Sequence, residues 1–493
     1  MSTTAGGALR VIDDLELGVL VGGTWRSSSD GRRFEVEDPS TGETIAEVAD
    51  GTARDGLDAL AAAADAFDTW SRTPSRTRSR VLRRAHELMV ERCDDLARLA
   101  TIETGKPLAQ ARGEVLGAAD FMLWYSEEAV RANGRIVESP DGAVTIVATR
   151  QPVGPCLLLT TWNYPAVTVA RKMAPALAAG CTVVCKPAEL APLSGLAIAQ
   201  ILVEAGAPDG VVNVVPTLRP GELVTPLLAD PRTRKVSLTG STPIGKRVLA
   251  ESGANVLRAS MELGGNAPFI VFADADLDLA VEEAAFSKAR GNGATCVAAN
   301  RIFAEAPIAD EFARRLADRL GSMRLGPGMD PESELGPLIS EREVAKTEEL
   351  LADATARGAS VLCGGARIDG PGHFFPPTVL TGVDPASRVV RQEIFGPLAP
   401  VFPFADEREA IARANDTDFG LVGYVFTRDL DRATRVSERL ESGMVGINQA
   451  ALGFPAAPFG GIKWSGVGRE GGAEGLEEYL NVKYVGIRRP QEA

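Results

Sequence analysis

Between residues 155 and 252 the chain alternates short apolar runs with stretches of helical periodicity. The apolar runs predict strands at 155–160, 181–186, 211–215 and 235–239, and the other stretches predict helices at 166–179, 193–205, 221–229 and 243–252. Strands that are apolar throughout are typical of a parallel sheet with both faces covered by helices. We therefore predict an α/β fold whose ligands bind beyond the carboxyl ends of the strands.

The flanking segments extend this pattern. Before residue 58 the chain is irregular; helical periodicity then covers 58–72 and 76–131 with a break at 104–107, and 134–154 is predicted to form a strand or hairpin. A second alternation predicts a second α/β domain, entered near residue 264. Its predicted helices are 277–290, 339–357, 407–414 and 430–440, and its predicted strands are 267–272, 360–363, 375–380, 421–426 and 444–448.

Composition narrows the classes of function. The 493 residues are too many for one core, and 52 Lys and Arg against 66 Asp and Glu give a net charge of −14, which argues against a nucleic-acid partner. No apolar stretch reaches the roughly 18 to 20 residues of a membrane span, and the N-terminal residues lack the pattern of a signal peptide. Six scattered cysteines suit reduced thiols. We therefore expect a cytoplasmic protein without a membrane partner.

Metal ligands are sparse. Cys181 and Cys185 are close in sequence, but they lie in a predicted buried strand with no histidine nearby. The two histidines, His86 and His373, each stand alone. We therefore expect no metal site, and a carboxylate is a better candidate than a histidine for the base of a nucleophilic cysteine.

Cys296 is the candidate nucleophile. It follows the predicted helix 277–290 and a turn that contains Gly291 and Gly293, before an apolar segment resumes. A thiolate is a strong nucleophile, and a loop with free backbone N–H groups and nearby positive charge can lower its pKa. The alternative is that Cys296 is simply a small buried apolar residue.

Two further features lie at predicted strand ends. Gly240, Ser241 and Gly245 join strand 235–239 to a helix, an arrangement that aims helix N-terminal amides at an anion. The loop nearly matches the Walker A loop of P-loop NTPases, but Arg247 occupies the position of the Ser or Thr that would hold magnesium. A dinucleotide pyrophosphate is therefore the better candidate ligand. Glu262 lies between apolar residues before a Gly-Gly turn; burial would raise its pKa towards that of a general base, whereas a solvent-facing carboxylate would do no chemistry.

Seven motifs in order carry a resemblance to the NAD(P)-dependent aldehyde dehydrogenase superfamily over about residues 20–490. They are TTWNYP at 160–165, KPAE at 186–189, LTGSTPIG at 238–245, MELGG at 261–265, GATC at 293–296, EIFGP at 393–397 and PFGGIKWSGVGRE at 458–470. The resemblance implies a Rossmann-type dinucleotide-binding domain at 1–133 and 155–263, a catalytic domain at 264–463, and oligomerisation segments at 134–154 and 473–493. It also implies a homodimer or homotetramer.

The resemblance assigns roles to residues. Cys296 would add to the aldehyde, Asn163 and the Cys296 N–H would hold the oxyanion, and Glu262 would activate the water that hydrolyses the thioester. The cofactor contacts that it implies are Thr161, Trp162, Lys186, Glu189, Gly240, Ser241, Gly245, Glu393 and Phe395. A carboxylate at Glu189 accepts from ribose hydroxyls and repels a 2′-phosphate, so NAD is expected to be preferred, with NADP possible.

Arg171 and Arg290 match positions that bind the substrate carboxylate in the succinate-semialdehyde dehydrogenase subgroup. Alternatively, they lie on helix surfaces or tune the thiolate, and the substrate is a neutral aliphatic or aromatic aldehyde. A CoA-acylating enzyme is disfavoured, because such relatives typically lack a counterpart of Glu262. A non-catalytic dinucleotide-binding homologue is also disfavoured, because it would not need intact Asn163, Glu262 and Cys296. The chain departs from the subgroup at Ala289, Ala294, Ala298, Phe454 and Asn481. Ala298 removes a redox partner for the nucleophile, and Phe454 is aligned with a substrate-binding serine. Asn481 replaces a glutamate that is suspected of relaying protons.

Overall fold

A computed structural model describes residues 12–490, so the N-terminal residues 1–11, in which we expect no signal peptide, lie outside the described part. The first sheet has the strand order β2-β1-β9-β8-β7-β10-β11-β21. Its strands are β1 (Val19–Val21), β2 (Thr24–Arg26), β7 (Cys156–Leu159), β8 (Val183–Lys186), β9 (Val212–Val214), β10 (Lys235–Thr239), β11 (Arg258–Glu262) and β21 (Gly466–Val467).

The core of this sheet, from β9 to β11, is parallel. The chain runs outward from β7 through β8 to β9 and then returns to β10 on the other side of β7. The strand order therefore reverses between β7 and β10, the position at which open α/β sheets bind ligands. The segments that follow β7 and β10 contain Asn163 and Ser241.

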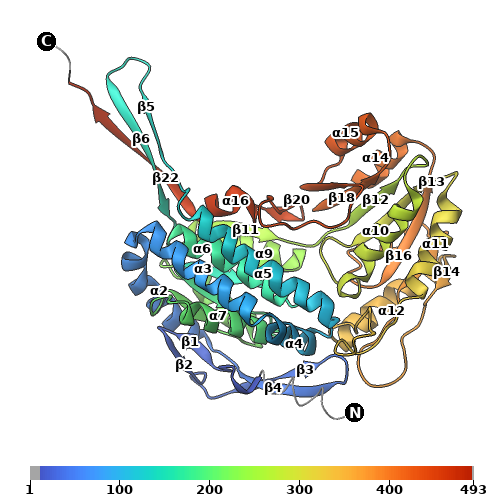
Figure 1. Ribbon diagram of the computed structural model, residues 1–493, viewed down its shortest axis with the longest axis horizontal. Coiled ribbons are helices and arrows are strands. Elements are labelled where there is room, and N and C mark those ends of the chain that lie inside the picture. The colour runs from blue at the N-terminus through green and yellow to red at the C-terminus, as the bar shows by residue number, and fades with distance from the viewer. Residues whose placement is uncertain (1–11, 491–493) are drawn as a thin grey trace.

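Helices cover this sheet (Figure 1). They are α2 (Ala53–Arg72), α3 (Ser75–Glu91), α4 (Cys93–Thr104), α5 (Leu108–Glu128), α6 (Pro165–Ala179), α7 (Leu193–Glu204), α8 (Pro220–Ala229), α9 (Thr242–Ser252) and the 3₁₀ turn η1 (Gly253–Asn255). The predicted break at 104–107 separates α4 from α5. There Gly105 ends α4 with φ of +75°, and an added Cβ would lie 2.4 Å from Pro337, so both conformation and space require glycine.

The second sheet has the order β14-β15-β16-β13-β12-β18-β19 and is parallel except at β14. Its strands are β12 (Ala267–Val271), β13 (Ala299–Glu305), β14 (Ser360–Cys363), β15 (Thr378–Thr381), β16 (Leu398–Phe404), β18 (Val422–Phe426) and β19 (Met444–Ile447). The helices of this half are α10 (Leu277–Ala289), η2 (Arg290–Gly293), α11 (Ala309–Gly321), α12 (Glu341–Ala356), α13 (Arg388–Arg391), α14 (Glu407–Asn415) and α15 (Leu430–Arg439). The last helix, α16 (Gly472–Glu477), packs instead against α5 and α6 of the first half.

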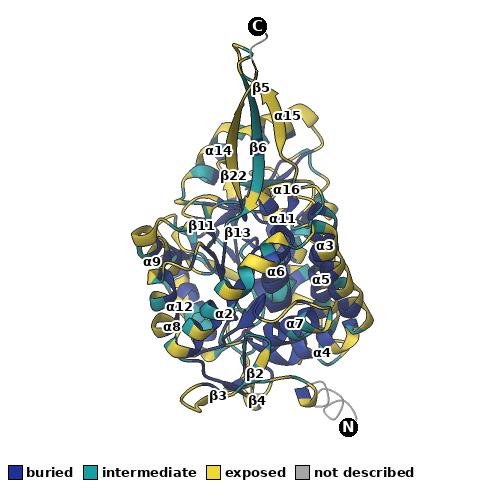
Figure 2. Ribbon diagram, turned by 90° about the vertical axis from the view of Figure 1, so that its left-hand side faces the viewer, coloured by how far each residue is buried: buried dark blue, intermediate teal, exposed yellow. Residues whose placement is uncertain are grey.

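A three-stranded antiparallel arm projects from the body (Figure 1). It consists of β5 (Arg135–Glu138), β6 (Val144–Pro152) and β22 (Leu480–Arg488), and β22 pairs with β6 along its full length. Figure 2 shows much of the arm exposed. Apolar side chains such as Ile136, which is 73% exposed, and Tyr484, which is 66% exposed, lie on it. The predicted hairpin and C-terminal strand are therefore confirmed as one sheet.

Some strands escaped prediction. The first part, predicted to be irregular, contains β1, β2 and the hairpin β3 (Arg33–Asp38) with β4 (Glu43–Ala49). β1 is apolar but only three residues long, and the other strands carry many exposed polar residues, so neither gives a strand pattern. β16 is central in the second sheet, yet its Pro400 and Pro403 obscure the strand pattern. The two-residue strands β17 (Phe419–Gly420) and β20 (Ile462–Lys463) pair with each other. No helix among the described residues is long and apolar enough to cross a membrane.

Candidate active site

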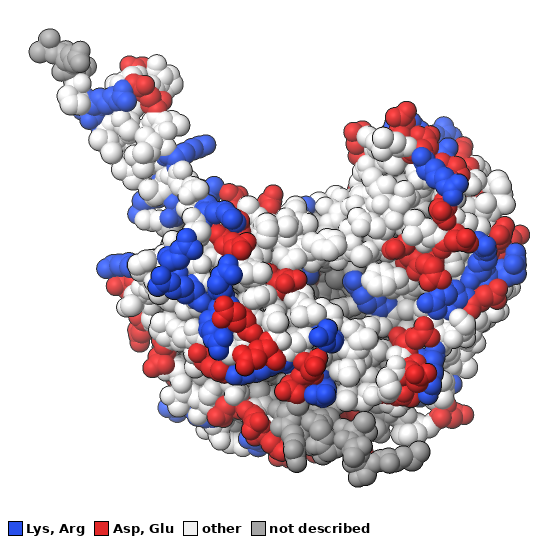
Figure 3. Space-filling model, in the orientation of Figure 1, with Lys and Arg blue, Asp and Glu red and all other residues white. Residues whose placement is uncertain are grey.

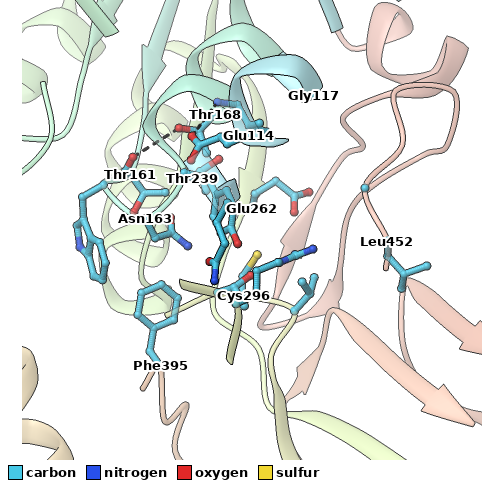
Figure 4. Close-up of a pocket in the computed structure, with 18 of the residues that line it drawn as sticks. Glu114, Gly117, Thr161, Asn163, Thr168, Thr239, Glu262, Cys296, Phe395 and Leu452 are labelled. Carbon is cyan, nitrogen blue, oxygen red and sulfur yellow. Dashed lines mark hydrogen bonds between the residues drawn. The ribbon is translucent and has the colours of Figure 1, made fainter. Parts of the chain in front are cut away.

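A cavity of about 950 Å³ opens where the two sheets meet. The segments after β7, β10 and β11 line one side, and the loops around Cys296, Phe395 and Leu452 line the other. Figure 4 shows Asn163, Glu262 and Cys296 gathered in one part of the cavity, with Phe395 and Leu452 at its periphery. The structure therefore brings the three predicted catalytic side chains into one site.

Cys296 follows a turn that only a few residue types can form. Gly291, Asn292 and Gly293 all have positive φ, and a Cβ at Gly293 would lie 2.2 Å from the carbonyl oxygen of Gly396. The buried Asn292 side chain donates to the carbonyls of Gly336 and Phe375, at 3.1 and 3.2 Å. These contacts place Cys296 at the cavity, where its side chain is partly exposed.

Burial raises the pKa of the Cys296 thiol to about 12, and the negative charge of Glu262 acts in the same direction. The guanidinium groups of Arg171 and Arg290 oppose this shift. The thiol is therefore protonated at neutral pH, so its attack on an electrophile requires a proton acceptor.

Glu262 ends β11 and is buried, with 4% of the residue exposed. Neither carboxylate oxygen has a hydrogen-bond partner in the described structure. Burial first, and the nearby Glu470 second, raise the pKa of Glu262 well above its ordinary value. The prediction of a buried carboxylate with a raised pKa is confirmed, and the alternative of a solvent-facing glutamate is wrong.

Behind Glu262 lies an ion pair that sequence reasoning missed. Lys172 is fully buried and donates to Glu470 Oε1 at 2.5 Å and to Ser237 Oγ at 3.0 Å. Only the glutamate of the GRE triplet in the last motif could have signalled this partner. The expectation that Asn481 stands in place of a proton-relaying glutamate is wrong, because Asn481 lies exposed on β22, opposite Gln151, and the carboxylate whose charge raises the pKa of Glu262 is Glu470.

Asn163 lies between β7 and α6 and is buried. Its Nδ2 donates to the carbonyl of Ala294 at 2.9 Å, which leaves the second amide hydrogen free, and its Oδ1 has no partner in the described structure. An amide held in this way next to a thiol can donate to an oxyanion that forms at the attacked carbon.

Another part of the cavity lining has the features of a dinucleotide site. Thr161, Trp162, Gly240, Ser241, Glu393 and Phe395 line it. The rings of Trp162 and Phe395 meet edge to face at 5.3 Å. Ser241 is the N-cap of α9 without a side-chain cap bond, so the amides of that helix end are available to a phosphate.

Glu393 is held in this wall of the cavity. Its Oε1 accepts from the Gly265 N–H at 2.8 Å, and burial raises its pKa to about 7. Gly264 packs against the same carboxylate, since an added Cβ would lie 2.6 Å from Glu393 Oε2. Glu393 thus presents a buried acceptor beside the site, in keeping with a contact to ribose hydroxyls.

Three predicted cofactor residues lie outside the cavity lining. Lys186 Nζ and Glu189 Oε2 form an ion pair at 2.5 Å. Gly245 lets α9 approach Leu263 closely, since an added Cβ would lie 2.4 Å from that side chain. For Gly245 the structure therefore shows a packing reason for glycine.

Arg171 and Arg290, the two residues expected to bind the substrate carboxylate, both line the cavity. The Arg171 guanidinium lies 5.0 Å from the Phe121 ring centroid and 4.2 Å from that of Phe459, and its Nε has no partner in the described structure. Arg290 lies 5.5 Å from the ring centroid of Tyr164. The alternative that both arginines lie on helix surfaces is therefore wrong.

Phe454 does not belong to this pocket. It is 61% exposed and is absent from the lining, which here consists of Leu452 and Gly453. Gly453 has φ of +117°, and an added Cβ would lie 3.6 Å from Arg171 Nη2. The bulk expected from Phe454 is therefore missing from the cavity.

A nucleotide-type sheet, a cysteine thiol, an oxyanion donor and a buried carboxylate define an oxidoreductase that works through a covalent thiol adduct. The family profile "Aldehyde dehydrogenase family" matches residues 25–485, and the chain belongs to that family. It is an NAD(P)-dependent aldehyde dehydrogenase.

Known proteins resemble it along nearly its whole length. Succinate-semialdehyde dehydrogenase of Paenarthrobacter nicotinovorans is 49% identical over 91% of this chain and 100% of its own. Succinate-semialdehyde dehydrogenase [NADP(+)] GabD of Escherichia coli is 45% identical over 95% and 97%. The crystal structure of betaine aldehyde dehydrogenase from Staphylococcus aureus in complex with NAD⁺ is 35% identical, with a TM-score of 0.96 over 99% of this chain and 98% of that one.

Proposed function

We propose that this dehydrogenase oxidises an aldehyde that carries a distal carboxylate, with succinate semialdehyde as the first candidate. The observation that carries the proposal is Arg171, a cation held between two aromatic rings with an unpartnered Nε at the cavity wall. Its nearest anion is Glu470, at 3.8 Å, which is already paired with Lys172. A substrate carboxylate would supply the missing partner, and an aldehyde without one would leave the cation unpaired.

In the proposed reaction the Cys296 sulfur attacks the aldehyde carbon, and the thiol proton leaves to Glu262. The Asn163 amide and the Cys296 N–H stabilise the oxyanion. When bound, the nicotinamide cofactor accepts a hydride from that carbon, which leaves a thioester on the sulfur. Once Glu262 has passed the thiol proton to Glu470, it takes a proton from water and the hydroxide attacks the thioester. The carboxylic acid leaves, and the Cys296 sulfur takes back a proton from Glu262.

The ion pair of Lys172 and Glu470 supports the base. The buried ammonium group of Lys172 lowers the pKa of Glu262 and so opposes the effect of Glu470, which raises it. The two carboxyl groups can therefore lie close together. We propose that this pair receives the proton that Glu262 gathers during each turnover.

For the cofactor we propose a preference for NAD over NADP. The carboxylate of Glu189 accepts well from ribose hydroxyls and repels a 2′-phosphate, whereas its partner Lys186 could accept NADP if Glu189 moved. The proposed contacts are Thr161, Trp162, Lys186, Glu189, Gly240, Ser241, Gly245, Glu393 and Phe395.

We also propose that the arm joins copies of the chain into a homodimer or homotetramer. Its apolar side chains are exposed to solvent, and β5 and β22 are open sheet edges in the described structure.

The proposed domain limits are those of the sequence analysis, and the chain passes from the first sheet to the second between Glu262 and Ala267. A cytoplasmic location remains an expectation from the six free cysteines. Acidic and basic side chains both occur over the face in Figure 3, and the lack of a nucleic-acid partner remains an expectation from the net charge of −14.

The experiment compares kcat/KM for succinate semialdehyde and butanal, which lacks the carboxylate, in the wild type and in Arg171→Ala. We expect a preference for the acid of about a hundredfold, or roughly 2.7 kcal/mol, that is lost in the variant. Phe454→Ala is the matched control, because the side chain lies outside the cavity and its removal should leave both values unchanged. Equal values for the two aldehydes in the wild type would refute the acid-bearing substrate and favour neutral aldehydes.

A further inference from the structure

A second buried ion pair lies directly beneath Asn163. Lys106 follows Gly105 in the turn between α4 and α5 and is 4% exposed. Its ammonium group pairs with Glu114 of α5, donates to the main-chain carbonyl of Asn163 at 2.7 Å and lies 4.2 Å from the ring centroid of Tyr164. Two of the three contacts of this buried cation, those to Asn163 and Tyr164, thus lie on the segment between β7 and α6.

Glu114 holds the other end of the same segment. Its Oε1 accepts from the N–H groups of Ala166 and Val167, at 2.9 and 3.3 Å, in the first turn of α6. That helix has no side-chain cap of its own at Tyr164, so a carboxylate from α5 does the work of a capping residue. The helix fixed in this way carries Arg171 two turns later.

The turn that carries Lys106 is itself held from the second half of the chain. Gly328 and Gly336 approach the main-chain carbonyls there so closely that an added Cβ would lie 2.3 Å from the Lys106 oxygen or 2.0 Å from the Gly105 oxygen. The Leu108 N–H donates to the Gly328 carbonyl at 3.0 Å. The main chain of the turn that carries Lys106 is therefore fixed by packing.

We propose that Lys106 and Glu114 are positioning residues that hold the Asn163 amide in place for attack on the aldehyde. The proposal rests on the proposed function of Asn163 as oxyanion donor. Neither residue touches Cys296 in the described structure, so both act through Asn163 and the first turn of α6. Loss of the ammonium group frees the Asn163 carbonyl and lets its amide move, whereas the hydrolysis of the thioester still has Glu262.

The test separates formation of the thioester from its hydrolysis. Rapid mixing of Lys106→Met with cofactor and succinate semialdehyde should show the NADH burst slowed by about tenfold to a hundredfold. Aldehyde deuterated at the carbonyl carbon should then show a larger isotope effect on kcat than in the wild type, because hydride transfer has become rate-limiting. Lys106→Arg keeps the positive charge and should recover part of the burst rate.

Lys235→Met is the matched control for the loss of a buried lysine. Lys235 is also fully buried and paired, with Glu478 at 3.4 Å, but its contacts do not include Asn163. The control should change stability and leave the burst rate and isotope effect unchanged. If Lys106→Met does not fold, Glu114→Gln serves instead, since it removes the charge and keeps an acceptor for the Ala166 N–H.

An unchanged burst rate in folded Lys106→Met or, in its place, Glu114→Gln overturns the proposal. Asn163→Ala distinguishes this failure from failure of the proposed function. If Asn163→Ala slows the burst and the ion-pair variants do not, only the positioning role is wrong. If Asn163→Ala leaves the burst unchanged, its role as oxyanion donor is wrong and the positioning role falls with it.

Discussion

Replacement of Glu262 by glutamine should stop the enzyme at the thioester. The substitution keeps the size of the side chain and removes the only carboxylate that lines the cavity beside Cys296 with both oxygens unpartnered in the described structure. A positioned general base contributes about 10² to 10⁴ in rate, or roughly 2.7 to 5.5 kcal/mol at 1.36 kcal/mol per factor of ten. Steady turnover should fall by that factor.

The assay is rapid mixing with NADH fluorescence as the signal. Glu262→Gln should still form about one NADH per active site and then stop. This burst should be slower than in the wild type, because Glu262 also accepts the thiol proton. Glu474→Gln, an exposed carboxylate on α16, is the control and should turn over like the wild type. Steady turnover equal to the wild type in Glu262→Gln would refute the role of this carboxylate in hydrolysis.

Further predictions concern pH, oxidation, cofactor and assembly. The pKa of Glu262 is raised in the folded protein, so the free energy of unfolding of the wild type should fall as the pH rises from about 4.5, the ordinary value, towards the raised pKa. Glu262→Gln should lack this loss. Tm curves of the two proteins that run parallel between about pH 5 and 8 would contradict the prediction. Peroxide should leave no intramolecular disulfide at Cys296, because Ala298 cannot pair with it; a bridge found there by peptide mapping would disprove this. Glu189→Ala should improve kcat/KM for NADP relative to NAD, and a ratio equal to that of the wild type would exclude Glu189 as the discriminating residue. Light scattering should give a dimer or tetramer mass, and a monomer would contradict the assembly through the arm.

The alternation of strands and helices could be predicted because it depends on local pattern. β7, β8 and β12 are buried along their whole length, because helices cover both faces of the sheet. Their sequences are therefore nearly continuous apolar runs, which are easy to recognise. Glu262 could be singled out in the same way, because it lies at the end of a parallel strand, whereas the role of Asn163 was implied only by the resemblance to the family. Short exposed strands such as β3 and β4 have no comparable signal.

The contacts between distant segments could not be predicted. Lys172 and Glu470 are 298 residues apart, and each looks like an ordinary surface residue in a sequence window. Lys106 gives no local sign that it reaches the Asn163 carbonyl. In the loop at 452–454 the sequence could not tell the exposed Phe454 from the cavity-lining Gly453, because side-chain direction in a loop follows no period.

The central claim is that Cys296 carries the acyl group of an acid-bearing aldehyde. The most direct measurement is peptide mass spectrometry of Glu262→Gln, quenched in acid after mixing with cofactor and succinate semialdehyde. The account predicts a succinyl thioester on the peptide that contains Cys296, in about the same amount as the NADH of the burst. NADH formed without any acyl group on Cys296, or with the acyl group on another residue, would contradict it.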